Sequence, residues 1–175
     1  VFCCPSGLFC CGHRRLYHLP LGDKPRTGTS PLRVIQNSMQ TILTRLSEKM
    51  RALRSCPYFT GLGDEILAEL VPGLRLIRYE RGEVIFWQDE PCPGLQIIER
   101  GMVKLFKLSP QGRELIVNIF KEGATFAEVP VFDGGANPVN AAALEESDIW
   151  QLDTAEIRSL LQKHPEMSKQ IMLNL

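Results

Sequence analysis

The side chains best able to bind a metal are concentrated at the start of the sequence. Of the six cysteines and three histidines, four thiols lie in the first eleven residues, at Cys3, Cys4, Cys10 and Cys11. Together with His13 they could hold zinc, whose usual ligands are thiolates and imidazoles. Adjacent Cys-Cys pairs do not have the spacing of a zinc knuckle, and an oxidation-prone tail is the simpler interpretation. We therefore predict no metal site.

The rest of the chain offers no catalytic constellation. His13, His18 and His164 lie outside the predicted strands, whereas a cupin-type metal enzyme needs several ligands on the strands of its barrel. The sequence contains no nucleophile–base motif, no glycine-rich phosphate loop followed by Lys-Ser or Lys-Thr, and no His-Glu-x-x-His. We expect a protein that is not an enzyme.

The composition is that of a globular chain with an uneven distribution of charge. The 175 residues are 44% hydrophobic and 23% charged, with a net charge of zero, and no apolar run approaches the ~20 residues of a membrane span. Up to Tyr58 nine basic residues oppose two acidic ones, whereas beyond it eleven oppose eighteen. The body keeps only Cys56 and Cys92, so we expect a reduced, cytoplasmic protein with no membrane partner.

The first half of the chain is expected to begin without order and then to form two helices. Residues 1–34 are predicted to be a disordered, cysteine-rich segment, because proline and glycine interrupt every period. Whether this segment belongs to the native protein stays open. An apolar stripe from Ile35 to Leu53 predicts a helix that ends near Cys56-Pro57. A second, short helix follows Gly63 and stops at Pro72-Gly73.

Short apolar runs separated by glycines, without helices between them, predict an antiparallel β-structure. Ser109-Pro110-Gln111-Gly112 fits a type I turn that joins two of these runs into a hairpin. The predicted fold class is mainly β with flanking helices, a double-stranded β-helix of the jelly-roll type. The predicted strands cover residues 74–79, 83–87, 95–99, 102–108, 113–120, 141–144 and 147–152.

The end of the chain is predicted to be helical. Asp153-x-x-Glu156 is a typical helix start, and Lys163 and His164 suit the negative end of that helix. After Pro165 a new apolar stripe begins and continues to Leu175. A stripe of this kind needs a partner surface.

Four short segments, in this order and at this spacing, carry a family resemblance: Tyr58-Phe59 with Leu62, Glu80-Arg81-Gly82-Glu83-Val84-Ile85-Phe86, Ile97-Ile98-Glu99-Arg100-Gly101-Met102-Val103-Lys104-Leu105, and Phe126-Ala127-Glu128. Over residues 39–175 the chain resembles the cyclic-nucleotide-binding, effector-sensing domain of Crp/Fnr-type bacterial transcription regulators. The resemblance implies an effector domain at 35–165, the start of a dimerisation helix at 166–175, a homodimer, and a small-molecule effector. It also implies that DNA is bound only through a C-terminal helix-turn-helix domain, which is not in this chain.

The stretch from Gly123 to Ala143 resembles the phosphate-binding cassette of that family, with Glu128 at the position of the carboxylate that accepts a ribose hydroxyl. The family's glycine before this carboxylate is replaced by Ala127, and its arginine is missing. No basic residue lies between Lys121 and Arg158. Because a buried anion without its cation costs several kcal/mol, tight cyclic nucleotide binding in the usual mode is disfavoured. The candidate effector-pocket residues are Phe126, Ala127, Glu128, Val129, Pro138, Val139 and Asn140, with Phe132 as a further lining residue.

Several alternatives stay open for this site. The effector could be a molecule other than a conventionally bound cyclic nucleotide, and haem is among those used by family branches that lack the arginine. A cyclic nucleotide could instead be bound by Glu128 and backbone N–H groups alone. The domain could also be a stand-alone interaction module with a degenerate pocket, in which Glu128 is a hydrogen-bonded turn residue. The N-terminal cysteines with Cys92 match poorly with the iron–sulfur branch of the family.

Overall fold

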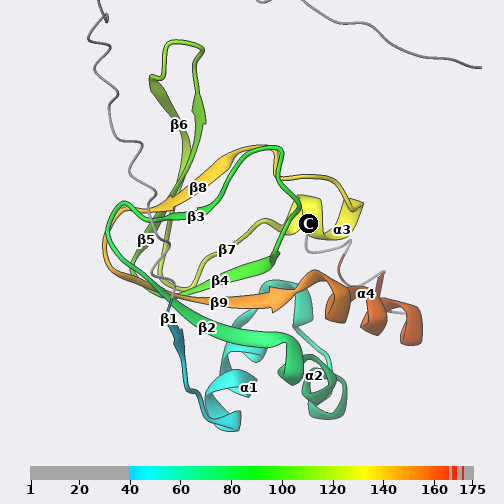
Figure 1. The fold of residues 1–175 in the computed structure, drawn as a ribbon. Helices are drawn as coiled ribbons and strands as arrows, with labels where there is room; N and C mark the ends of the chain where they lie inside the picture. The colour runs from blue at the N-terminus through cyan, green and yellow to red at the C-terminus, as the bar shows by residue number, and fades with distance from the viewer. Residues whose placement is uncertain (1–39, 166, 169–170, 172–175) are drawn as a thin grey trace, which may run out of the picture. The chain divides into compact units, whose positions relative to one another are not determined.

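The computed structural model describes residues 40–165, 167–168 and 171 (Figure 1). The predicted disordered segment 1–34 and most of the predicted helix 166–175 lie outside the described residues. The described chain forms two antiparallel sheets with helices at one side, so the predicted fold class is confirmed. None of the described helices has the length and apolar composition that crossing a membrane requires.

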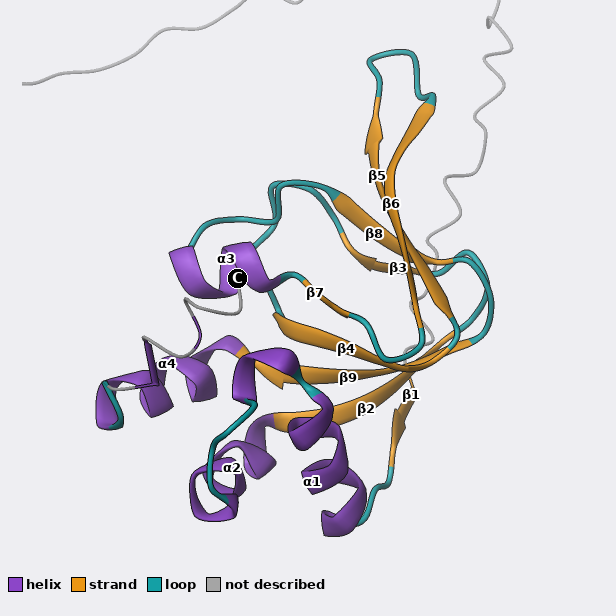
Figure 2. Ribbon diagram, turned by 180° about the vertical axis from the view of Figure 1, so that it is seen from behind, coloured by secondary structure: helices purple, strands orange, loops and turns teal. Residues whose placement is uncertain are grey.

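The two sheets have different surroundings (Figure 2). The five-stranded sheet has the order β1-β2-β9-β4-β7 and carries α1 and α2 on one face, while the four-stranded sheet has the order β3-β8-β5-β6. Their strands are β1 (Gln40–Ile42), β2 (Leu74–Tyr79), β3 (Val84–Phe86), β4 (Gly94–Arg100), β5 (Met102–Leu108), β6 (Glu114–Lys121), β7 (Thr125–Phe126), β8 (Asn140–Ala143) and β9 (Ser147–Asp153). The helices are α1 (Leu46–Ser55), α2 (Asp64–Leu70), α3 (Glu128–Asp133) and α4 (Thr154–Lys163), with 3₁₀ turns at Pro57–Phe59 and Val71–Gly73.

The central strands of the five-stranded sheet are buried on both faces and separate two apolar cores. In β2, Leu74 contributes to the core under the helices, whereas Ile77 and Tyr79 contribute to the core between the sheets. Successive side chains of a strand point to opposite faces, so a strand with two buried faces needs a nearly continuous apolar run. In β9, Trp150 faces the helices and Ile149 faces the other sheet. This arrangement explains why the central strands show no polar–apolar alternation.

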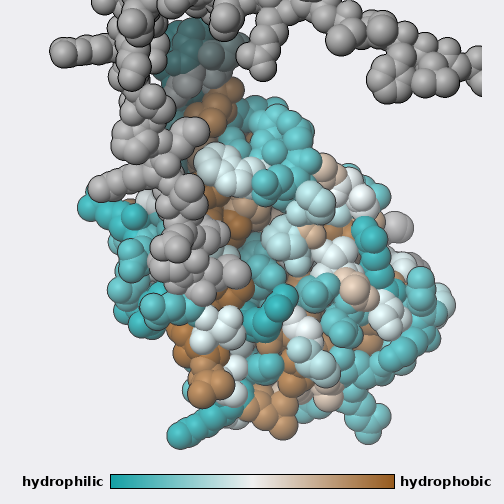
Figure 3. Space-filling view, in the orientation of Figure 1, coloured by the Kyte–Doolittle hydropathy of each residue, from teal (hydrophilic) through white to brown (hydrophobic). Residues whose placement is uncertain are grey.

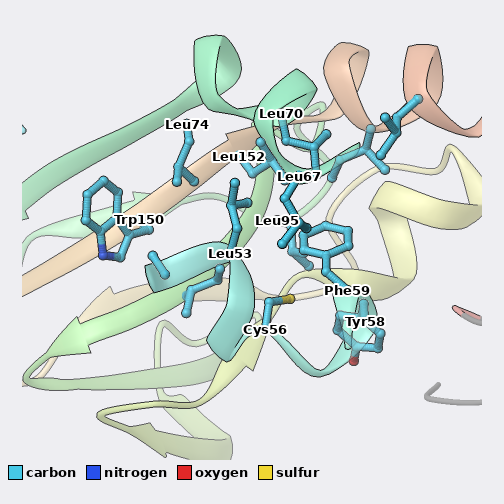
Figure 4. Packing of buried hydrophobic residues seen from close by; sticks show 14 of the residues in the cluster. Leu53, Cys56, Tyr58, Phe59, Leu67, Leu70, Leu74, Leu95, Trp150 and Leu152 are labelled. Carbon is cyan, nitrogen blue, oxygen red and sulfur yellow. The ribbon is translucent and has the colours of Figure 1, made fainter. Parts of the chain in front are cut away.

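The core under the helices joins side chains from distant parts of the sequence (Figure 4). Leu53 of α1 and Leu67 and Leu70 of α2 pack over the leucines of the central strands. The indole of Trp150 is almost fully buried, and its Nε1 donates to a carboxylate oxygen of Glu99 at 2.9 Å. The helices are therefore fixed on the sheet by apolar packing, and the buried indole N–H is satisfied.

The predicted helix over residues 35–56 is wrong in its first part. Within the described residues, Gln40–Ile42 form β1, which pairs antiparallel with β2, and α1 begins only at Leu46. The start of α1 is fixed by the carboxylate of Glu48, which accepts the N–H of Arg45 at 2.8 Å. Ile42 has the spacing of a helical apolar stripe, and this spacing led to the wrong prediction. The segment instead forms backbone hydrogen bonds with the edge of β2, and the apolar periodicity of a sequence does not predict such pairing. The predicted end of the helix is confirmed by the C-cap at Cys56.

Most other predicted elements are confirmed with shifts of one or two residues. The Ser109–Gly112 turn closes with the N–H of Gly112 donating to the carbonyl of Ser109 at 2.8 Å. The side chain of Asp153 caps α4 by accepting the N–H of Ala155 at 2.8 Å. Beyond α4, Met167 and Ile171 are helical and pack into the core under the helices. The start of the C-terminal stripe therefore finds its first partner surface within the same domain.

Candidate functional site

A small cavity lies inside the β-roll, between α3 and the inner sides of the strands. Its volume is about 90 Å³. Apolar side chains from β3, β5, β6 and β7 form most of its wall, and the start of α3 and the segment before β8 border it. The residues that line it are Phe86, Leu105, Phe120, Phe126, Ala127, Glu128, Val129, Pro130, Asn137, Pro138 and Val139.

The structure places six of the seven candidate pocket residues on this cavity, namely Phe126, Ala127, Glu128, Val129, Pro138 and Val139. Asn140 does not line it. Its Oδ1 accepts the N–H of Gln88 at 2.8 Å, and its Nδ2 donates to the carbonyl of Phe106 at 3.1 Å. Both groups of the amide are therefore used to hold the start of β8 in place. The ligand-binding role of the six cavity residues stays a prediction.

Phe132 was expected to line the pocket, and this expectation is wrong. Its ring packs edge-on against Tyr58 at a centroid separation of 5.6 Å, on the helix side of the sheet. In α3, Val131 and Phe132 pack into the core under the helices, whereas Val129 lines the cavity and is 54% exposed. Sequence reasoning did not identify this helix.

Sequence reasoning also missed five lining residues, namely Phe86, Leu105, Phe120, Pro130 and Asn137. Three of them lie on strands that the sequence predicted, and a signal was present in the aromatic residues. Phe120 stacks on Phe126 with centroids 5.8 Å apart, and Phe86 lies 6.1 Å from the same ring. The aromatic wall could have been inferred from strand alternation once the pairing of β5 and β6 was known.

Glu128 is the first residue of α3 and follows a strained backbone position. Ala127 has a φ of +66°, and α3 ends at Gly134 with a φ of +82°. The interpretation of Glu128 as a turn residue is therefore wrong. A carboxylate in the first turn of a helix is favourably placed relative to the helix dipole. Ala127 and Glu128 are both half-buried at the cavity.

The cavity has a negative wall and no cation. Of the described residues in its lining, Glu128 is the only ionisable one. Among the residues that the structure describes, its carboxylate makes no ion pair and no hydrogen bond to another side chain or the backbone. Burial raises the pKa of Tyr58 to about 12, and the charge of Glu128 adds to this effect. The nearest basic residue further along the chain, Arg158, lines a separate surface groove between α3 and α4.

Asn137 lies behind the cavity wall and holds the segment before β8 in place. The residue is completely buried, its N–H donates to the carbonyl of Glu90 at 3.0 Å, and its carbonyl accepts the N–H of Asp89 at 2.9 Å. Its Nδ2 donates to the carbonyl of Trp87 at 3.2 Å. This bond fixes the orientation of the amide, because the reverse orientation would place two oxygens together. The Oδ1 is left without a partner among the described residues.

The donor set of the described chain does not favour a metal. No group of three or more His, Cys, Asp or Glu side chains comes together within residues 40–165, 167–168 and 171. Cys56 and Cys92 are free thiols, and burial raises the pKa of Cys56 to about 11. The N-terminal cysteines lie outside the described residues, so the structure does not test the expectation about them.

These features together define a class of protein. The chain combines an antiparallel β-roll, helices beside it, and a pocket next to a short helix that begins with a carboxylate. Residues 76–164, just over half of the chain, match the family model described as Cyclic nucleotide-binding domain. The chain belongs to this family.

Two relatives with similar sequences agree with this family assignment. Over 114 residues the chain is 31% identical to the CRP-like cAMP-activated global transcriptional regulator of Mycobacterium tuberculosis, covering 65% of this chain and 51% of the regulator. It is 25% identical over 113 residues to the Cyclic AMP receptor protein of Thermus thermophilus, covering 65% of this chain and 52% of that protein. The matched segment spans about half the length of these relatives.

Solved structures show the same fold. The sensor domain of the transcriptional regulator DNR from Pseudomonas aeruginosa is 26% identical with a TM-score of 0.66, covering 73% of this chain and 85% of that domain. The N-terminal domain of a transcriptional regulator from Streptomyces coelicolor is 28% identical with a TM-score of 0.60, covering 70% of this chain and 86% of that domain. The resemblance to Crp/Fnr-type regulators is therefore confirmed.

Proposed function

We propose that this chain is the effector-sensing domain of a Crp/Fnr-type transcription regulator whose effector is not a cyclic nucleotide bound in the usual way. The effector occupies the cavity of the β-roll, and its binding is relayed through the helix after α4 to a DNA-binding domain. The similarity to the sensor domain of DNR supports the sensory role.

The cavity that contains Glu128 but no cation is the observation that carries this proposal. A cyclic phosphate keeps its negative charge at pH 7 and would lie against a carboxylate without a compensating guanidinium. Such an unpaired, desolvated charge costs several kcal/mol, which corresponds to orders of magnitude in affinity. The cavity of about 90 Å³ is also smaller than the ~300 Å³ at the lower end of ordinary ligand pockets.

A second candidate is cyclic AMP bound by Glu128 and backbone N–H groups without an arginine. The relative from M. tuberculosis, which is described as cAMP-activated, favours this candidate. In this mode Glu128 would accept the ribose hydroxyl, and the phosphate would depend on N–H donors alone. The cavity would first have to open.

Isothermal titration calorimetry of the purified chain with cyclic AMP and with cyclic GMP distinguishes the two candidates. We expect no heat of binding at micromolar nucleotide. Micromolar binding that is lost in Glu128→Ala would overturn the first candidate and establish the second. Glu122→Ala, which removes an exposed carboxylate outside the cavity, is the matched control.

Haem does not fit the cavity. The described part of its lining contains no histidine, cysteine, methionine or tyrosine, the side chains that hold haem iron in proteins. A volume of about 90 Å³ is also far below that of an ordinary ligand pocket. An absorption spectrum of the chain mixed with haem tests this conclusion, and we expect no shift of the Soret band relative to free haem.

The quaternary and cellular roles are part of the same proposal. We expect a cytoplasmic homodimer that binds DNA only through its DNA-binding domain and catalyses no reaction. The regulatory relatives support the non-enzymatic role, although lysophospholipase nte1 of Aspergillus fumigatus also contains a segment 20% identical to this chain. Analytical ultracentrifugation measures the oligomeric state, and a monomer at all concentrations would contradict the dimer.

A further inference from the structure

The polar side chains that line a pocket restrict what can occupy it. In this cavity Glu128 supplies a half-buried carboxylate that makes no hydrogen bond to another described residue. A carboxylate accepts hydrogen bonds, and among the described residues no lysine, arginine or histidine lines the wall. A buried acceptor without a donor costs about 1–3 kcal/mol. An occupant that brings donors removes this cost, whereas an occupant that brings further acceptors increases it.

We propose that the effector is a small molecule with an apolar body, a hydrogen-bond donor group and no negative charge, such as an amine, with its donor group on Glu128. This inference rests on the proposed function, because it takes the β-roll cavity as the effector site. It goes beyond that proposal by naming the charge and polarity of the effector.

The apolar body follows from the rest of the wall. Phe86, Phe120 and Phe126 form a contiguous aromatic surface, and Leu105 and Val139 complete the lining. An apolar surface of this kind stabilises hydrocarbon groups and gives nothing to a charged one. Aromatic faces also attract cations, which adds to the attraction of the carboxylate.

The volume sets the size of the occupant. A cavity of 150 Å³ lined by apolar side chains holds one benzene molecule. On the same scale, the present cavity of about 90 Å³ holds an occupant of about four non-hydrogen atoms. Isobutylamine, isobutanol and isobutyrate share one carbon frame of this size and differ in charge, so they are suitable probes.

The decisive experiment is a titration of the full 175-residue chain with these three probes and with cyclic AMP, observed by amide NMR shifts. The amides of Ala127 and Val139 report on the cavity, and the amide of Ser159 reports on the separate groove beside α4. We expect isobutylamine to bind at the cavity about tenfold more tightly than isobutanol, with no binding of isobutyrate or cyclic AMP.

Three variants connect the result to individual side chains. Glu128→Gln should lower the affinity for isobutylamine about tenfold, to the level of isobutanol, because the charged partner is lost. Val139→Trp should abolish binding of every probe by filling the cavity. Glu122→Gln, the matched control, should change nothing. Circular dichroism and the thermal midpoint establish that each variant is folded before its titration.

The outcomes separate the two proposals. Preference for isobutyrate or cyclic AMP, lost in Val139→Trp, would overturn the inference about charge and leave the cavity as the effector site. Equal affinities for isobutylamine and isobutanol, unchanged in Glu128→Gln, would also overturn the inference. If no probe shifted the amides of Ala127 and Val139, both the inference and the cavity as effector site would be wrong.

Discussion

Ala127 adopts a left-handed backbone conformation, with a φ of +66°, at the point where β7 passes into α3. For a residue with a Cβ atom this conformation costs about 1–2 kcal/mol. The family resemblance places glycine at this position, and glycine adopts the conformation without steric cost. The backbone is therefore strained at Ala127, next to the Glu128 carboxylate. The packing of the surrounding residues must keep Ala127 in this conformation.

A substitution series at Ala127 tests this strain. We expect Ala127→Gly to leave the free energy of unfolding unchanged or slightly higher, and Ala127→Val to lower it by about 2 kcal/mol, because a β-branched residue tolerates positive φ least. Urea denaturation measures both. Ala155→Gly, in the first turn of α4 at an exposed position, should lower stability and serves as the control. A large loss in Ala127→Gly would contradict the assigned strain.

At the scale of the elements, α2 and α4 are joined by a polar contact at their ends. The carboxylate of Glu69 accepts a hydrogen bond from Lys163 at 2.8 Å and lies 3.1 Å from the ring nitrogen of His164. Both contacts come from the negative end of α4, where cations are favoured. Lys163 first, and then His164, lower the pKa of the Glu69 carboxyl below its ordinary value.

The sign of this shift predicts how stability changes with pH. A carboxyl group whose pKa is lower in the folded chain stabilises it above the unfolded pKa, and the contribution disappears as pH falls through the folded pKa. We therefore expect wild type to be more stable than Glu69→Gln at pH 7, with the difference vanishing in the acid range below about 4. Denaturant titrations at several pH values measure it. A difference independent of pH would exclude the ionic contribution, and high salt should reduce it.

Close contact between β4 and β9 requires the glycine at Gly94. A Cβ there would lie 2.0 Å from the carbonyl oxygen of Leu152, and φ is +146°. Gly112 has a positive φ of +76° as well, but a Cβ at that exposed turn meets nothing within 4 Å. We expect Gly94→Ala to destabilise the chain by at least 3 kcal/mol and Gly112→Ala by about 1 kcal/mol. Similar losses for both, measured by urea denaturation, would show that the contact relaxes easily.

The elements also show what can be predicted from sequence. The strands were predictable because glycines and the Ser109–Gly112 turn mark their ends. Helix α3 was not, since it has only six residues and contains Pro130. β1 was not either, because its pairing partner β2 is more than thirty residues away. Most of the cavity residues near Glu128 could be identified, because they are close to it in the sequence. Phe86 and Leu105 could not, because only strand pairing brings them to the cavity.

At the scale of the whole domain, the β5–β6 hairpin differs from every other part of the described chain. It extends beyond the rest of its sheet, and apolar surface is visible over it in the space-filling view (Figures 1 and 3). β6 is the edge strand of its sheet and leaves Leu115, Ile116, Val117 and Ile119 between 44% and 66% exposed. Contiguous exposed apolar residues on an edge strand favour contact with another molecule.

Replacement of these residues should separate association from folding. We expect the double variant Leu115→Lys, Val117→Lys to keep the thermal midpoint of wild type within a few degrees, because neither side chain is buried. Its sedimentation should show less self-association at high protein concentration. Leu95→Lys, at a fully buried position, should instead prevent folding. Unchanged association in the double variant would exclude this strand as a contact surface.

The uncovered strand also has a practical consequence for anyone handling the domain. Encounters through β6 are bimolecular, so their rate rises with the square of protein concentration, whereas folding does not depend on concentration. Dilute samples should therefore remain free of precipitate for longer than the thermal midpoint of unfolding alone suggests. Concentrated stocks should precipitate while the domain is still folded. We therefore expect the storage life of the domain to depend on the edge strand β6 much more than on the stability of the two apolar cores.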